Sequence, residues 1–158
     1  MDWSDYFLSI AEAISKRSSC GRRRIGAVIV NEKNIIISTG YNGTPSGMLN
    51  CVDGGCARLG KDKSIGTGVS LPEDMCMHAE ENAIIFAARY GQAVDGAMIY
   101  CTVKPCHSCL KKIIQAGIRH IIYDGYNGEW SYDQASHESY MKLVNESGIV
   151  VTRHYQKK

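Results

Sequence analysis

The chain has 158 residues, 44% of them hydrophobic, so it fits a single domain over residues 1–158 that buries about two-thirds of its unfolded surface. Its formal net charge of +2 is too small to favour a nucleic-acid partner. No run approaches the roughly 18 uninterrupted apolar residues of a membrane helix, which argues against a membrane protein.

The first part of the chain predicts a helix, two strands and a long loop. Apolar side chains recur at helical spacing before the Ser18-Ser19 pair: Phe7, Ile10, Ala11 and Ile14. Two β-branched segments follow at 25–30 and 35–39, and the polar residues between them indicate a hairpin. The glycine-rich span 40–74 has little periodicity and is longer than a loop that only connects two elements, so we expect it to bind a ligand.

The second half of the chain predicts helices that alternate with strands. The expected helices cover 79–90, 105–117 and 134–147. The expected strands cover 98–103, 119–123 and 149–154. This alternation indicates an α/β domain with helices on both faces of the sheet.

Two short motifs supply the residue types of a zinc site. His78 and Glu80 form a His-x-Glu motif, and Cys106 and Cys109 form a Cys-x-x-Cys motif directly after Pro105. Zinc binds imidazole nitrogen and thiolate sulfur tetrahedrally, and a catalytic site leaves the fourth position to water. The first turn of a helix also favours thiolate, because the positive end of the helix dipole lies there. We therefore expect His78, Cys106 and Cys109 to bind a catalytic zinc ion.

Glu80 is expected to move protons rather than to bind the metal. It lies two residues after His78, too near in a helical turn to be an easy fourth ligand. Its carboxylate is instead well placed to reach a water molecule on the zinc ion, and zinc lowers the pKa of such a water from about 15.7 towards roughly 7. The predicted role of Glu80 is to carry a proton from this water to a ring nitrogen and then to departing ammonia.

Each motif has a simpler explanation when it stands alone. A Cys-x-x-Cys can be a redox pair or half of a structural zinc knuckle, and a His-x-Glu occurs by chance in many helices. In the combination H-x-E…P-C-x-x-C the two motifs are typical of zinc-dependent deaminases. The joint pattern therefore favours a catalytic zinc centre.

The chain resembles the zinc-dependent cytidine deaminase superfamily and, within it, the deoxycytidylate (dCMP) deaminase family. The similarity extends over roughly residues 6 to 125 and rests on segments 25–30, 40–47, 78–84, 105–109 and 115–118. The metal motifs mark only the superfamily, whereas Gly-Tyr-Asn-Gly at 40–43 and the glycine-rich loop after it point to dCMP deaminases.

The resemblance implies a three-layer α/β/α fold around a central five-stranded mixed sheet. It also implies the reaction of dCMP with water to give dUMP and ammonia, and a homo-oligomer, either a dimer or a hexamer. Many members of the family are activated by dCTP and inhibited by dTTP, so regulation by these nucleotides is a further expectation.

The resemblance further suggests residues for substrate and effector. The expected substrate residues are Asn42, Tyr123 and Tyr126. The expected effector residues are Arg24, Tyr41, Gly43 and Gly47. The alternative for Asn42 is a turn asparagine in left-handed geometry. The three-arginine run at 22–24 is more typical of a solvated face or a regulatory-nucleotide site than of catalysis.

Four more cysteines suggest a second metal site. Cys20 and Cys51 match positions where some dCMP deaminases carry ligands for a structural zinc ion, and Cys56 and Cys76 would complete a four-sulfur set. The alternative is reduced, buried thiols that behave as small hydrophobic side chains. The odd total of seven cysteines and the acidic N-terminus, which does not look like a signal peptide, lead us to expect a cytoplasmic protein.

Other functions share the same zinc chemistry. A tRNA adenosine deaminase would have a basic face and a short loop, and the modest charge and the cysteine-containing span 40–74 argue against it. Cytosine, cytidine and guanine remain alternative small-molecule substrates. A non-catalytic, zinc-stabilised binding protein would lack the proton carrier, yet Glu80 is present.

Overall fold

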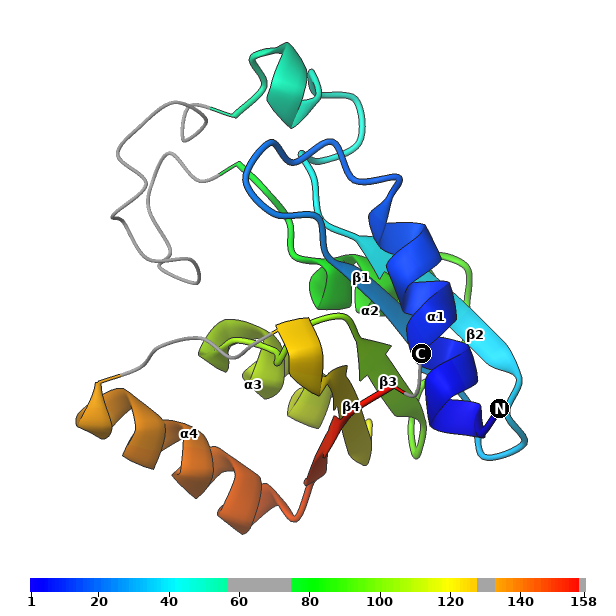
Figure 1. Ribbon diagram of the computed structural model, residues 1–158, viewed down its shortest axis with the longest axis vertical. Coiled ribbons are helices and arrows are strands. Elements are labelled where there is room, and N and C mark those ends of the chain that lie inside the picture. Colours follow the sequence, from blue (N-terminus) through cyan, green and yellow to red (C-terminus); the bar gives the residue numbers. More distant parts are fainter. Residues whose placement is uncertain (57–74, 128–132, 157–158) are drawn as a thin grey trace.

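A five-stranded mixed sheet forms the centre of the molecule (Figure 1). The structure is a computed structural model, and it describes residues 1–56, 75–127 and 133–156. The strands are β1 (Gly26–Val30), β2 (Ile36–Tyr41), β3 (Met98–Cys101), β4 (His120–Asp124) and β5 (Val150–His154). The helices are α1 (Trp3–Ser15), α2 (Ala79–Arg89), α3 (His107–Gln115) and α4 (Gln134–Ser147), with the short 3-10 helices η1 (Cys51–Asp53) and η2 (Gly125–Asn127).

The strand order is β2-β1-β3-β4-β5. β1 pairs antiparallel with β2 and with β3, whereas the β3–β4 and β4–β5 pairs are parallel. The predicted hairpin joins β1 to β2, and its turn is closed by the Asn31 side chain, which accepts hydrogen bonds from the backbone N–H groups of Lys33 and Ile35. Parallel pairing requires crossovers, and α3 and α4 provide them.

Helices cover both faces of the sheet, as the sequence predicts. On one face, Phe7, Leu8 and Ala11 of α1 pack against alternate residues of β1, β3 and β4. On the other face, α2, α3 and α4 bury a second cluster that includes Ala83 and Leu110. The five residues of β1 are all buried, because this strand lies inside the sheet with a helix layer on each side. The expected three-layer α/β/α fold is therefore confirmed.

Gly40 lets β2 lie unusually close to α2. A Cβ atom at Gly40 would lie 2.1 Å from the carbonyl oxygen of Ala79 and 2.5 Å from the backbone nitrogen of Ala83. Real side chains do not tolerate such distances to backbone atoms, so this position requires glycine. The contact fixes the N-terminal end of α2 against the sheet, next to its N-cap residue, His78.

The predicted elements all occur, with ends that differ by a few residues. β3 ends at Cys101 rather than at 103, and α3 begins at His107, with Cys106 as its N-cap, rather than at Pro105. The predicted loop 40–74 contains the end of β2 and η1, and its residues 57–74 lie outside the described part of the chain. Within the described ranges, no helix is both long and apolar enough to cross a membrane.

Candidate active site

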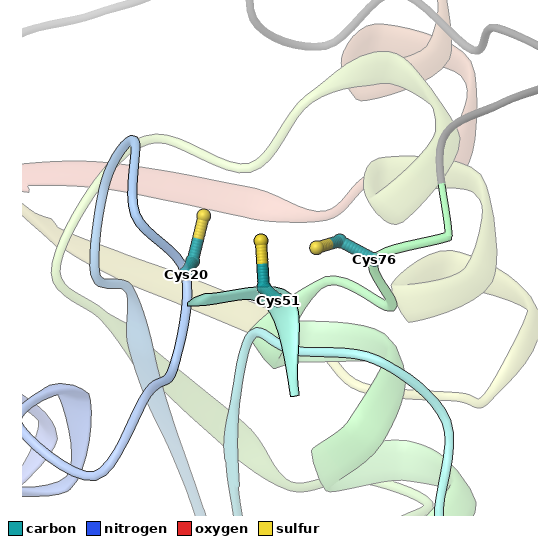
Figure 2. A group of neighbouring side chains, drawn as sticks. All are labelled: Cys20, Cys51 and Cys76. Atoms are coloured by element: carbon teal, nitrogen blue, oxygen red, sulfur yellow. The ribbon is translucent and has the colours of Figure 1, made fainter. Parts of the chain in front are cut away.

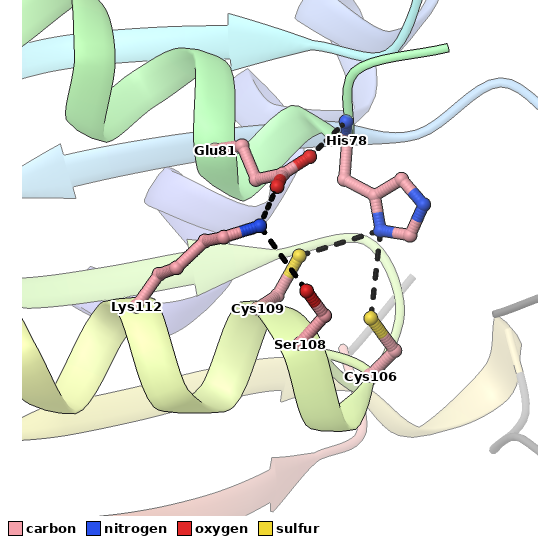
Figure 3. A network of polar contacts seen from close by, with 6 residues as sticks. All are labelled: His78, Glu81, Cys106, Ser108, Cys109 and Lys112. Atoms are coloured by element: carbon pink, nitrogen blue, oxygen red, sulfur yellow. Dashed lines mark hydrogen bonds and ion pairs between the residues drawn. The ribbon is translucent and has the colours of Figure 1, made fainter. Parts of the chain in front are cut away.

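Two helix N-termini on the same face of the sheet bring the predicted metal ligands together (Figure 3). His78 is the N-cap residue of α2, with an extended backbone. Cys106 is the N-cap residue of α3, and Cys109 lies in the first turn of that helix. An antiparallel bridge between Gly43 and Met77 holds His78 just beyond the end of β2, and Cys106 follows the end of β3.

The three donor atoms have the spacing that zinc requires. His78 Nδ1 lies 3.5 Å from Cys106 Sγ and 3.3 Å from Cys109 Sγ, and all three atoms lie within 4.8 Å of one another. Tetrahedral bonds of about 2.3 Å to sulfur and about 2.0 Å to nitrogen put such atoms about 3.5 Å apart. Both cysteines are buried. The residues present thus fit a zinc ion with three protein ligands.

A mutual hydrogen bond shifts the pKa values of the two thiols in opposite directions. A hydrogen bond with Cys109 is the main reason why the pKa of Cys106 is lowered to about 4, and the same bond raises the pKa of Cys109. Metal binding displaces such protons, because zinc binds thiolate. The site is consequently prepared to exchange one thiol proton for a cation.

Glu80 is the acidic side chain that faces the donor atoms. It is 3% exposed, and burial raises the pKa of its carboxyl, with a smaller opposing effect from the charge of His78. Its further neighbours include Cys106 and Cys109. The adjacent Glu81 is directed elsewhere: it accepts a hydrogen bond from the backbone N–H of His78 at 2.9 Å and pairs with Lys112. The geometry therefore favours Glu80 over Glu81 as the proton carrier.

A second group of sulfur atoms lies where three chain segments meet (Figure 2). Cys20 comes from the loop after α1, Cys51 from η1 and Cys76 from the segment before α2, and their Sγ atoms lie within 4.8 Å of one another. Cys56 Sγ lies 3.9 Å from Cys76 Sγ. Hydrogen bonding with Cys76 lowers the pKa of Cys20 to about 5 and raises that of Cys76. Burial, followed by the neighbouring Cys20 and Cys56, raises the pKa of Cys51.

The three expected substrate residues differ in their burial and in their partners. The Asn42 amide is buried and hydrogen-bonded within the protein: its Oδ1 accepts from Ser18 Oγ and the Ile25 N–H, and its Nδ2 donates to the Arg23 carbonyl. Tyr123 is buried in β4, and Tyr126 is exposed with its ring against Tyr155. Contact between these three residues and a substrate remains a prediction.

Three of the four expected effector residues line one pocket. Tyr41, Gly43 and Gly47 border a cavity of about 170 Å³. Its other lining residues include Arg17, Asn82 and Phe86, and the Arg17 guanidinium lies 5.9 Å from the centre of the Tyr41 ring. Arg24 is exposed in the loop before β1 and lies outside this lining.

Sequence reasoning missed several residues around these sites. Asn82 donates a hydrogen bond to the Tyr41 carbonyl at 2.7 Å, which joins α2 to the end of β2. A polar residue in the alanine-rich helix two positions after Glu80 was the available signal. No periodicity marks Arg17 or Lys112, because their partners lie on other elements.

Comparisons with known proteins agree with this geometry. Residues 1–125 match the family model described as the cytidine and deoxycytidylate deaminase zinc-binding region. The chain is 40% identical over 147 residues to the deoxycytidylate deaminase of Schizosaccharomyces pombe, and 38% identical over 149 residues to that of Saccharomyces cerevisiae. These alignments cover 93% and 94% of the chain but only 42% and 44% of the two relatives, so the chain spans less than half of their length.

A solved structure has the same fold over nearly the whole chain. The dCMP deaminase of cyanophage S-TIM5, in complex with dCMP and dUMP, superposes with a TM-score of 0.70 and 29% sequence identity. The match covers 95% of each chain.

Proposed function

Because this chain belongs to the cytidine and deoxycytidylate deaminase family, we propose that it is a zinc-dependent enzyme that deaminates dCMP to dUMP and ammonia. One observation carries the proposal: His78 Nδ1 and the sulfur atoms of Cys106 and Cys109 have zinc-site spacing, next to the buried carboxyl of Glu80. The choice of dCMP is supported by the relatives named deoxycytidylate deaminase and by the similar cyanophage enzyme, which binds dCMP and dUMP.

The residues of the chain suggest how protons would move. Zinc held by His78, Cys106 and Cys109 would make a water molecule acidic enough to lose a proton near neutral pH. In the proposed reaction, water adds across the C4–N3 bond of the cytosine ring, and the amino group leaves as ammonia. A carboxylate oxygen of Glu80 takes one proton from water and gives it to N3. It then takes the remaining proton from the new C4 hydroxyl and delivers it to the amino group, so that the C4 carbonyl forms as the C–N bond breaks. Burial of Glu80 keeps competing bulk water from this path.

A second, structural zinc ion is part of the proposal. The convergence of Cys20, Cys51 and Cys76, with Cys56 at 3.9 Å from Cys76, supports a four-sulfur site. Such a site would connect three segments that the sheet does not hold, including the described segments on either side of residues 57–74.

Regulation by dCTP and dTTP is proposed at the pocket bordered by Tyr41, Gly43 and Gly47. Its volume of about 170 Å³ is below the usual range of about 300 to 1,000 Å³ for small-molecule sites, so it would hold only part of a nucleotide. Arg17 offers a cation for a phosphate group. We also propose that the protein is cytoplasmic and forms a homo-oligomer, either a dimer or a hexamer.

A substrate comparison tests the proposed activity. The zinc-loaded protein is incubated with dCMP, dCTP, cytidine, deoxycytidine, guanine and tRNA, and ammonia release is measured with and without added dCTP and dTTP. The proposal predicts that dCMP reacts fastest. Preference for an unphosphorylated base or nucleoside would overturn the substrate assignment, and inosine formation in tRNA would move the protein to the RNA-editing deaminases.

A further inference from the structure

A network of polar contacts joins the two helices that carry the candidate metal ligands (Figure 3). Glu81 of α2 and Lys112 of α3 form an ion pair between Glu81 Oε1 and Lys112 Nζ. The other carboxylate oxygen of Glu81 accepts the backbone N–H of His78 at 2.9 Å. Lys112 Nζ also donates to Ser108 Oγ at 3.1 Å, within the turn between Cys106 and Cys109.

The network therefore reaches both metal-binding turns without touching the metal-binding atoms. One end holds the main chain of His78, and the other end holds the side chain of Ser108, between the two cysteines. His78 is 28 and 31 residues away from Cys106 and Cys109 along the chain, so local backbone geometry does not bring the three side chains together. The relative position of the two turns is set by tertiary contacts alone.

The ion pair is better protected than an ordinary surface pair. The Glu81 side chain is 14% exposed, and the Lys112 side chain is 47% exposed. Exposed ion pairs contribute little to stability, because water screens their charges. The mostly buried carboxylate of Glu81 accepts two charge-assisted or backbone hydrogen bonds, and these fix its orientation. Glu81 and Lys112 have no part in the proton transfers assigned to Glu80, so their contacts call for another role.

We propose that Glu81 and Lys112 are positioning residues of the zinc site. They hold His78 in register with Cys106 and Cys109 before the metal arrives, and in this way they raise the affinity for zinc. This inference rests on the proposed function, because it assumes that zinc is the metal bound at these three residues. Groups that orient metal ligands without binding the metal typically change affinity by about 10- to 100-fold.

A double-mutant cycle on zinc affinity tests the proposal. The dissociation constant for zinc is measured without substrate, by competition with a chromogenic chelator, for the wild type, Glu81→Gln, Lys112→Met and the double variant. All four proteins carry Cys51→Ser, which removes the second proposed metal site, so that only the site at His78 is titrated. Glutamine keeps an acceptor for the His78 N–H and removes only the charge, so Glu81→Gln separates the ion pair from the helix cap. Lys111→Met is the matched control, because Lys111 is an exposed neighbour of Lys112.

Each single variant is expected to bind zinc about tenfold more weakly than the wild type, and the double variant no more weakly than either single one. The loss should shrink at high salt, because the pair is partly exposed. Absorption spectra of the cobalt-substituted variants should retain the bands of a site with two thiolates and one imidazole.

Two results would overturn the inference. One is zinc affinity within about twofold of the wild type in both single variants, and the other is a multiplied loss of about a hundredfold in the double variant, which would mean that the two residues act independently. A wild-type protein that binds no zinc would instead overturn the proposed function, and the inference with it. Affinity measured without turnover keeps these failures apart.

Discussion

Asn42 illustrates how one residue can carry both a structural and a functional expectation. Its amide joins the loop after α1 to the end of β2, through Ser18, Arg23 and Ile25. The sequence alone suggested a turn residue or a substrate contact, and neither interpretation includes the hydrogen bonds that the buried amide makes to protein groups. The structure therefore adds a stabilising role that any substrate contact would have to share.

Asn42→Ala is expected to lower the free energy of unfolding by about 3 kcal/mol, because it removes the acceptor of the Ile25 N–H and the donor to the Arg23 carbonyl at a largely buried position. Urea-induced unfolding measures the change. Asn145→Ala, on the exposed side of α4, is the control and should leave stability nearly unchanged. A loss for Asn42→Ala no larger than that of the control would contradict the assigned hydrogen bonds.

The site residues differ in how well the sequence predicts them. His78 with Glu80, and Cys106 with Cys109, stand in two short motifs whose internal spacing is set by one helical turn, so each motif could be recognised locally. The meeting of the two motifs depends on tertiary contacts and was predicted from their joint pattern. The partners of Glu81 lie on another helix, and only the folded chain brings them together. Tyr123 and Tyr126 are only three residues apart near the end of β4, but Tyr123 is buried and Tyr126 is exposed.

At the scale of elements, the position of α2 against β2 controls where His78 lies. Hydrophobic periodicity predicted both elements within two residues of their ends. It did not predict their close approach, because the feature that permits it is the missing side chain of Gly40. The 3-10 helices η1 and η2 were also missed, since three residues are too few to show a period.

Gly40→Ala should force β2 and α2 apart, because the added Cβ would lie 2.1 Å from the Ala79 carbonyl oxygen. We expect a loss of about 2 kcal/mol in unfolding free energy and weaker zinc binding. Thermal unfolding and zinc titration measure the two effects. Gly43→Ala is the control for stability, since its Cβ would lie at an ordinary 3.6 Å from Ser19 Oγ. Equal behaviour of the two variants would refute this account of the helix position.

Three chain segments meet at the cluster of Cys20, Cys51 and Cys76, and a metal ion bound there would cross-link them. Cys51→Ser should lower the zinc content by one ion per chain and leave the site at His78 loaded. Elemental analysis after gel filtration measures the content, and Cys106→Ser provides the comparison in which the other ion is lost. Zinc content unchanged in Cys51→Ser would exclude the second site.

At the scale of the whole molecule, alternating helices and strands predicted the fold class correctly. The strand order β2-β1-β3-β4-β5 was not predicted, because β1 pairs with both β2 and β3 and nothing in the local sequence identifies the partners of a strand. The unbroken apolar run at 26–30 indicates a strand covered on both faces, but it does not name the neighbouring strands. The chain ends are also tied together, since His154 Nε2 lies 2.8 Å from Asp5 Oδ1. One domain over residues 1–158 stays a prediction.

The whole arrangement places one buried carboxyl, that of Glu80, beside three candidate metal ligands. The direct test compares dCMP turnover by the zinc-loaded wild type with that of Glu80→Gln, with zinc content measured in the same samples and Glu146→Gln, on the exposed face of α4, as control. If Glu80 transfers the protons, Glu80→Gln keeps its zinc and its turnover falls by about 10²- to 10⁴-fold, while the control stays active. Turnover of dCMP in Glu80→Gln close to that of the wild type would contradict this role.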